Sequence, residues 1–370
     1  MVIKYRSIQT RPFLKTGLVF LLLLLNSISC SHQPRSKEEQ TVILWDNMQA
    51  VALEIPKAGL GTSKLNKLKV SLHSSSSKTA ILGDFVDEGT TVIFHPLVPL
   101  TPELEYDIYY EEKHIETIVI PLPENSEPPQ VTQIFPSSDT VPENLLKMYF
   151  RFSEPMQEVR SLDFIKVRNL TTDSIADVFL ELQPELWNKE HTQLTLWLDP
   201  GRIKTDLIPN RERGLPIVRD NTYEITISGT WKDYRGIALG KNYTKILKVG
   251  ERDSRSPDSD SWEITSPQAD RKEPLRVRFN EVMDAIVSEE MIRIFSNDRE
   301  IDGVISFEDD ERVLLFTPAE NWKAGKYELR INAKIEDLAG NSLNKLFDVD
   351  LKKKDQIREK DFYMRSFVIE

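Results

Sequence analysis

The chain lacks most of the residues from which catalytic and metal sites are built. It has one cysteine in 370 residues, so no disulfide can form within it. Its five histidines are scattered without metal-ligand spacing, which argues against zinc. It contains no Gly-x-Ser-x-Gly elbow, phosphate-binding loop or dinucleotide fingerprint. We predict no enzymatic activity, cofactor or metal, although abundant acidic residues leave a glycosidase-type carboxylate pair open.

Long apolar runs are equally scarce, and the one clear run lies at residues 17–25. Basic residues precede it, at positions 4, 6, 11 and 15, and small polar residues follow it up to Cys30. The run is about half the ~20 residues that a membrane-spanning helix needs. Residues 1–29 are therefore predicted to be an export signal that is removed.

The only cysteine, Cys30, directly follows Ser27-Ile28-Ser29. This pattern resembles the bacterial lipobox in the looser form of Bacteroidetes-type lipoproteins, with Ser27 at the usual leucine position. The resemblance implies lipidation of Cys30, and several acyl chains, at about 0.8 kcal/mol per buried CH₂, make a stable anchor. Ser31 favours the outer membrane by similarity to proteobacterial sorting, with the periplasmic or cell-surface face left undecided. The alternative is an ordinary signal peptide that leaves an idle thiol.

The mature chain is acidic. Removing residues 1–29 takes away four of the 48 basic residues and none of the 59 acidic ones, so the net charge falls from −11 to −15. Phosphate backbones need clusters of lysine and arginine, so we predict no nucleic-acid partner. The predicted partners are the membrane, through the lipid anchor, and an unidentified envelope protein or glycan. The polar residues 30–40 are predicted to form a tether.

Apolar and polar residues alternate along much of the mature chain, which is typical of half-buried antiparallel strands. Turn signals such as Glu88-Gly89 and Ala324-Gly325 interrupt these runs at short spacing. The prediction is an all-β protein. The clearest alternating runs are residues 68–72, 106–110, 223–227, 275–279 and 327–331.

The sequence repeats internally. Phe152-Ser-Glu-Pro-Met156 recurs as Phe279-Asn-Glu-Val-Met283. Tyr223-Glu-Ile, followed by Lys232-Asp233 and Gly236, recurs at a shorter offset as Tyr327-Glu-Leu, followed by Glu336-Asp337 and Gly340. The difference places an insertion at residues 201–220, which is predicted to be a long loop. A third, diverged copy surrounds Tyr106. The predicted domains are 41–124, 125–250 and 260–352, followed by a charged tail, 353–370. The tail is predicted to contain an extra strand that could join either a sandwich edge or a partner.

These repeated motifs, together with Pro128-Pro129 and Asp337-Leu-Ala-Gly-Asn341, resemble the bacterial Ig-like family of the S-layer SbsA type. The resemblance implies tandem immunoglobulin-like β-sandwich domains and says little about function, since such modules serve many roles.

Structural roles are predicted for the repeated residues. A tyrosine before an alternating strand suits the corner in which its hydroxyl bonds nearby backbone, so we expect this at Tyr106, Tyr223 and Tyr327. Methionines 156 and 283 are expected to fill gaps between sheets. Carboxylates at strand ends commonly accept backbone N–H bonds, and we expect this at positions 154 and 281. Asp337 and Asn341 are expected to flank a turn with positive φ at Gly340.

Two functional hypotheses follow. The first is a non-catalytic cell-envelope lipoprotein that acts as a structural or protein-interaction module. The second is a carbohydrate-binding accessory lipoprotein that stacks sugars on Trp187, Trp197 and Trp231, unless these rings lie in the core. Acidic runs at positions 253, 258 and 260 and at 308–311 lack the spacing of a calcium loop and are predicted to be solvated.

Overall fold

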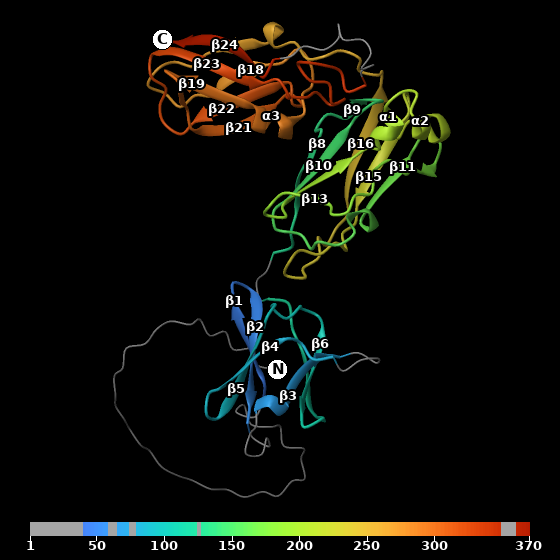
Figure 1. The fold of residues 1–370 in the computed structure, drawn as a ribbon, viewed down its shortest axis with the longest axis vertical. Helices are drawn as coiled ribbons and strands as arrows, with labels where there is room; N and C mark the ends of the chain where they lie inside the picture. The colour runs from blue at the N-terminus through green and yellow to red at the C-terminus, as the bar shows by residue number, and fades with distance from the viewer. Residues whose placement is uncertain (1–39, 58–64, 74–78, 124–126, 349–359) are drawn as a thin grey trace, which may run out of the picture. The chain divides into compact units, whose positions relative to one another are not determined.

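The computed structural model describes residues 40–57, 65–73, 79–123, 127–348 and 360–370. The strands form six sheets, and apolar side chains from pairs of sheets meet in three cores, giving three β-sandwiches in chain order (Figure 1). The first sandwich forms one compact unit. The second and third together form another, which we call the two-sandwich unit. The prediction of tandem all-β Ig-like domains is confirmed.

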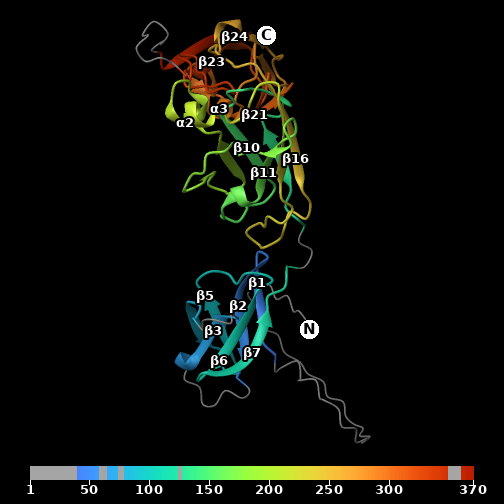
Figure 2. The same ribbon diagram turned by 90° about the vertical axis from the view of Figure 1, so that its right-hand side faces the viewer.

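The first sandwich packs a four-stranded sheet, β1-β2-β5-β4, on a three-stranded sheet, β3-β6-β7 (Figure 2). Its core contains Leu53, Phe94 and Ile108, which are fully buried. A short 3₁₀ turn, η1 (Leu65–Lys67), leads into β3. The strands are β1 (Val42–Asp46), β2 (Gln49–Pro56), β3 (Leu68–Leu72), β4 (Gly83–Asp87), β5 (Thr91–Pro96), β6 (Glu105–Tyr110) and β7 (Lys113–Val119).

The second sandwich packs sheet β13-β14-β10-β8 on sheet β12-β11-β15-β16-β9. All pairs are antiparallel except β9 with β16, where a short parallel strand covers one end of the sheet edge. Two 3₁₀ or helical connections, η2 (Ser161–Asp163) and the insertion described below, join the layers. The strands are β8 (Val131–Phe135), β9 (Thr140–Pro142), β10 (Lys147–Phe152), β11 (Ile165–Asn169), β12 (Ser174–Ile175), β13 (Leu186–Trp187), β14 (Gln193–Trp197), β15 (Thr222–Ile227) and β16 (Tyr243–Gly250).

The third sandwich packs sheet β17-β18-β22-β21 on sheet β20-β19-β23-β24. The turn η3 (Ser259–Ser261) precedes it, and one helix, α3 (Ala285–Met291), starts at an N-cap Asp284 that accepts a hydrogen bond from Val287 N. The strands are β17 (Glu263–Thr265), β18 (Leu275–Arg278), β19 (Ile292–Ser296), β20 (Arg299–Glu300), β21 (Gly303–Glu308), β22 (Val313–Pro318), β23 (Gly325–Asn332) and β24 (Phe362–Ile369).

Sequence alternation explains how the strands pack. In β15, Tyr223, Ile225 and Ile227 point into the core and are at most 2% exposed, while the residues between them face outward. Burying each such side chain contributes about 1.5–3 kcal/mol relative to leaving it in water. Met156 and Met283 are buried in the second and third cores, as predicted.

All three tyrosine corners are confirmed. The hydroxyl of Tyr106 accepts a hydrogen bond from Thr101 N at 2.9 Å, and that of Tyr223 accepts one from Val218 N at 3.0 Å. The hydroxyl of Tyr327 accepts from Lys323 N at 3.2 Å and donates to Lys323 O at 2.9 Å. Each bond satisfies a phenol that would otherwise be buried without a partner, so the same device anchors one loop in each sandwich.

The insertion at 201–220 is not a plain loop, which corrects the prediction. It contains two short helices, α1 (Pro200–Ile203) and α2 (Ile208–Arg213), each with proline in its first turn. Arg202 is 7% exposed and donates to the carbonyl oxygens of Asp177, Gly214 and Leu215. A buried guanidinium needs such acceptors, and here they hold the insertion against the second sandwich.

The tail forms a full strand of the third sandwich. Strand β24 pairs antiparallel with β23 over eight consecutive residues, and its Phe367 and Ile369 are 7% and 1% exposed. The sequence left open whether this segment pairs with its own sandwich or with a partner, and the structure shows that it pairs with its own.

We expect Ile369→Ala to destabilise the two-sandwich unit by about 2–4 kcal/mol, because it leaves a cavity in the core. Val368→Ala, at the adjacent and 51% exposed position, should cost less than about 0.5 kcal/mol. Urea unfolding of both variants checks this. Equal effects would show that β24 is not held in the core.

Candidate functional site

The three tryptophans proposed as a sugar platform do not share a surface. Trp231 is 0% exposed, in the second core, and therefore offers no ring face to a ligand. Trp187 is half-buried and packs edge-on against Trp231, with His191 stacked on it at 6.0 Å between ring centroids. Its indole N–H donates to Glu185.

Trp197 is also half-buried, and Lys147 Nζ lies 5.1 Å from the centre of its ring. No ring contact joins it to the other two tryptophans in the part of the chain that the structure describes. Cys30, the predicted lipidation site, lies outside the described residues.

A buried polar group joins the second sandwich to the third within the two-sandwich unit. Asp284, at the start of α3, is 5% exposed and accepts a hydrogen bond from the hydroxyl of Tyr149 in β10 at 2.7 Å. Lys147, also in β10, lies 3.7 Å from Asp284 and 2.5 Å from Glu336. Arg151 adds an ion pair to Glu289 at 2.7 Å. One face of a single strand thus contacts three acidic residues of the next sandwich.

Burial shapes the electrostatics of this group. Loss of water raises the pKa of Asp284, while nearby Lys147 and the hydrogen bonds from Val287 N and Tyr149 oppose the rise. Burial, followed by the charge of Asp284, raises the pKa of Tyr149, so its phenol stays a hydrogen-bond donor. Breaking such a buried pair on one side leaves an uncompensated polar group, which is costly.

Further polar and apolar contacts fasten the same junction. Glu311, predicted to lie on a solvated acidic tip, is instead 3% exposed and accepts a hydrogen bond from Ser137 N at 2.9 Å, which corrects that prediction. The insertion takes part as well, because the backbone N–H and the hydroxyl of Thr205 donate hydrogen bonds to the Asp348 carboxylate. The same carboxylate forms an ion pair with Arg252. The junction also contains apolar contacts, because Leu338 and Phe347 pack against the core of the second sandwich.

Gly340 allows this close approach. Its φ of +77° favours glycine, and a Cβ there would lie 2.3 Å from a methyl carbon of Leu146 in the second sandwich. The Asp337 carboxylate accepts hydrogen bonds from Ala339 N and Asn341 N, at 2.8 and 2.9 Å, as the predicted glycine turn requires. The repeated motif therefore serves the junction as well as its own turn.

Three carboxylates meet beside this junction. Ligand oxygens of Asp253, Glu281 and Asp337 lie within 4.8 Å of one another, next to a cleft of about 570 Å³. Asp253 comes from the segment between the sandwiches, Glu281 from the bend between β18 and α3, and Asp337 from the glycine turn. Glu281 was predicted to accept backbone N–H bonds, but it makes no hydrogen bond among the described residues, so that prediction is wrong.

Crowding changes the ionisation of these groups. Burial, followed by the charge of Asp253, raises the pKa of Glu281 to about 7, with Arg312 and Arg255 opposing the rise. Burial and then Asp253 also raise the pKa of Asp337 well above its usual range. The cluster is therefore suited to holding a proton near neutral pH.

These three are the described residues whose geometry could hold a metal ion, since hard cations take carboxylate oxygens. Nothing else points to one. Asp337 already accepts three hydrogen bonds from its own turn, and the arginines at positions 255 and 312 supply positive charge. Asp258 and Asp260, which the sequence grouped with Asp253, are exposed and stay outside the cluster.

The first sandwich holds a second polar group that the sequence did not reveal. Asp107 in β6 is 6% exposed and lies 3.0 Å from His73 Nδ1 and 3.2 Å from His114 Nε2. Thr117 Oγ1 donates to it at 2.6 Å, and the Tyr109 hydroxyl does so at 3.3 Å. Burial raises the pKa of Asp107, but the bonds from Thr117, His73 and His114 outweigh it and lower the pKa overall.

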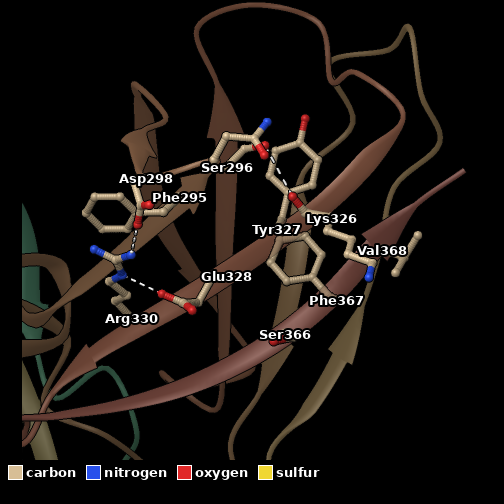
Figure 3. A pocket seen from close by; sticks show the side chains of 11 residues that line it. Phe295, Ser296, Asp298, Lys326, Tyr327, Glu328, Arg330, Ser366, Phe367 and Val368 are labelled. Atoms are coloured by element: carbon tan, nitrogen blue, oxygen red, sulfur yellow. Dashed lines mark hydrogen bonds and ion pairs between the residues drawn. The ribbon is translucent and has the colours of Figure 1, made fainter.

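A shallow groove of about 440 Å³ lies on the outer face of sheet β20-β19-β23-β24 (Figure 3). The Arg330 guanidinium covers the ring of Phe295 at 4.0 Å and pairs with Asp298 and Glu328. Ser366 and Val368 of β24 form its other wall. The Arg330 guanidinium covers the Phe295 ring and is itself paired with two carboxylates, so that ring is not free to stack on a sugar.

The sequence did not predict the Asp107 group or the acidic cluster, because their members lie far apart along the chain. His73 and His114 are 41 positions apart, and the members of the acidic cluster span 84 positions. Motif spacing reports only local neighbours, whereas both groups arise from register between strands. The one available signal was the repeat itself, since Glu281 and Asp337 each belong to a repeated motif. Among the described residues, no helix is long and apolar enough to cross a membrane.

Comparison with known proteins agrees with this architecture. Residues 257–351 match the family model of the bacterial Ig-like domain. None of the curated proteins matches the chain.

Solved structures show weak similarity only. An Escherichia coli alpha-2-macroglobulin structure is 12% identical, with 56% of this chain and 67% of that chain covered, at a TM-score of 0.23. Domains 1–6 of the surface layer protein SbsC are 10% identical, with 67% and 41% covered, at 0.25. A structure with a xylogluco-oligosaccharide is 12% identical, with 75% and 53% covered, at 0.20. The chain thus spans about half or less of the last two.

The raised pKa of Glu281 predicts a pH-dependent stability. Between its unfolded value near 4.5 and about 7, the folded state binds more protons than the unfolded one, so the free energy of unfolding falls as pH rises through this window. At pH 8 we expect Glu281→Gln to be more stable than wild type by about 1–2 kcal/mol, with a flatter pH profile.

Thermal unfolding at pH 5 and pH 8 measures this difference. Glu320→Gln, at an exposed position of the same sandwich, serves as the matched control and should follow wild type at both values. A Glu281→Gln variant that is less stable than wild type at pH 8 would contradict the prediction.

Proposed function

We propose that this chain is a non-catalytic cell-envelope lipoprotein whose Ig-like sandwiches act as a structural or protein-interaction module. The observation that carries the proposal is the junction inside the two-sandwich unit, where Lys147, Tyr149 and Arg151 of one strand bind acidic residues of the next sandwich. A module that must keep surfaces at a set spacing needs such a joint, because a bare linker would let the domains move independently.

The chemistry of the junction supports a fixed joint. Its charged groups are largely buried and mutually paired, so separating the sandwiches would expose apolar surface and break compensated ion pairs together. Gly340 and Leu146 interlock at the same place. Ig-like domains commonly serve as spacers and binding modules, which agrees with this role.

The proposal includes the cellular location of the protein. We assign Cys30 as the lipidated residue and the outer membrane as the anchoring surface, on the strength of the export signal, the lipobox-like Ser27-Ile28-Ser29 and Ser31. The acyl chains would hold the acidic body at the membrane through the polar segment 30–40.

The carbohydrate-binding alternative gains no support from the aromatic residues. Trp231 is enclosed, Trp187 is stacked with His191, and Trp197 lies under Lys147. A glycan screen in which binding is lost in Trp187→Ala and Trp197→Ala would revive it.

Rigidity can be measured directly. Ile175 and Val304 are 77% and 70% exposed, lie on β12 and β21, and so place one spin label on each sandwich of the two-sandwich unit. In a Cys30→Ala background, cysteines at these two positions are the only thiols. We expect pulsed electron spin resonance to give one narrow distance distribution, and we expect it to broaden when Lys147→Ala and Arg151→Ala remove the junction contacts. A broad distribution in the unmodified junction would overturn the proposal of a fixed joint.

Anchoring is tested in cells. We expect a labelled fatty acid to enter the wild-type chain and not the Cys30→Ala variant, because Cys30 offers the only thiol, while Ser31→Ala should label normally. Protease treatment of intact cells then distinguishes the two faces of the outer membrane. Equal labelling of wild type and Cys30→Ala would contradict the lipoprotein assignment.

A further inference from the structure

In each of the three sandwiches, the strand that follows the tyrosine-corner strand lies near an exposed edge of its sheet. It is β7 in the first sandwich, β16 in the second and β24 in the third. In each case this strand lies at or next to the sheet edge, where unpaired backbone groups can recruit another strand. Proteins usually protect such edges with charged side chains, bulges or covering segments.

The first two copies carry these protections. Strand β7 contains Lys113 and Glu116, and its pairing with β6 is interrupted by a register shift. Strand β16 contains Lys245 and Lys248, and the parallel strand β9 covers its end. Both edges are therefore poor templates for another chain.

Strand β24 has fewer of these protections, because its one charged residue is Arg365 and a covering contact is found only past its end, where Ala269 N donates to Glu370 O. It lies beside β23 at the edge of the sheet (Figure 1). Its pairing with β23 runs through eight residues without a shift, and it contains no lysine, proline or glycine. On its outer face Phe362, Met364 and Val368 are 52%, 59% and 51% exposed. Its one charged residue, Arg365, turns inward and donates to the carbonyl oxygen of Trp262 at 3.1 Å.

The backbone of β24 is also directed toward the open edge. Ala333 N donates to Asp361 O at 2.9 Å, so odd-numbered residues of this segment bond toward β23. The even-numbered residues 362, 364, 366 and 368 then point their N–H and C=O groups away from the sheet. At the end of the strand, Glu370 O shows the same alternation but already accepts a hydrogen bond from Ala269 N of the same chain, so the open edge comprises residues 362–368.

We propose that the edge of β24 is a self-association surface, on which β24 of a second copy of this chain pairs antiparallel about a two-fold axis at Ser366. In this register Met364 faces Val368 of the second copy, and both lie on the apolar outer face. Arg365 faces Phe367 of the second copy, so no like charges are opposed. Residues 364, 366 and 368 of both strands form the hydrogen-bonded pairs, because Glu370 O, opposite residue 362, is already bonded to Ala269 N.

Charge favours a second copy at this edge. The chain has a net charge of −11, so two copies repel each other over most of their surface. The single charge on residues 362–369 is positive, which makes β24 a place where copies approach without opposing carboxylates. A single strand pair buries less than the ~800 Å² per partner of a standard stable interface, so a weak dimer is expected.

The cysteine content makes the test clean. In a Cys30→Ala background, Ser366→Cys places the only thiol on the proposed two-fold axis, and Ile175→Cys places it on an exposed strand of the second sandwich as a control. Under mild oxidation of the full-length chain, Ser366→Cys should form a disulfide-linked dimer at least tenfold faster than Ile175→Cys. Equal rates would overturn the proposal.

A charge substitution supplies the second arm. Met364→Lys gives β24 the kind of edge protection that β16 has, and we expect it to abolish concentration-dependent dimerisation in sedimentation equilibrium between about 1 and 300 µM, a range set by the weak affinity above. Ile175→Lys is the matched control and should dimerise like wild type. Circular dichroism melting verifies that both fold, and Ser366→Lys replaces Met364→Lys if that variant melts early. A wild-type chain that stays monomeric throughout, or a lysine variant that dimerises normally, would overturn the proposal.

Discussion

The packing of β10 against the third sandwich is the constraint on which the architecture of the two-sandwich unit depends. This strand is shared between two environments, because Met148 and Phe150 point into the second core while Lys147, Tyr149 and Arg151 reach acidic residues of the next domain. Alternation along one strand thus connects the stability of a sandwich to its attachment to its neighbour. A substitution in β10 is therefore expected to affect both the stability of the second sandwich and its attachment to the third.

The acidic cluster follows from the same constraint. Glu281 and Asp337 are shielded from water beside the junction and Asp253 lies next to them, so the pKa of each of the two rises. A raised carboxylate pKa costs stability at high pH, which the ion pairs of Lys147 and Arg151 offset nearby. The junction therefore combines contacts that favour closure with a titratable group that opposes it above neutral pH.

The repeats show how one fold was varied for different surroundings. The tyrosine corner is kept in all three sandwiches because it anchors a loop that each copy needs. The strand that follows it differs in each copy, with lysines and a covering strand in the second and an apolar outer face in the third. Core positions respond to packing within each sandwich, whereas edge positions respond to what lies beyond the sheet.

Local chemistry let the sequence determine the strands, the tyrosine corners, the glycine turn at Gly340 and the burial of Met156 and Met283, because alternation and turn residues act over a few positions. It did not reveal the two helices of the insertion, where Arg202 is stabilised by carbonyl groups from distant segments. Only the tertiary structure decided that Glu311 is buried, that Trp231 is core and that Asp253, Glu281 and Asp337 meet. These outcomes depend on the register of strands and the contact of two sandwiches, which bring together residues that no sequence spacing relates.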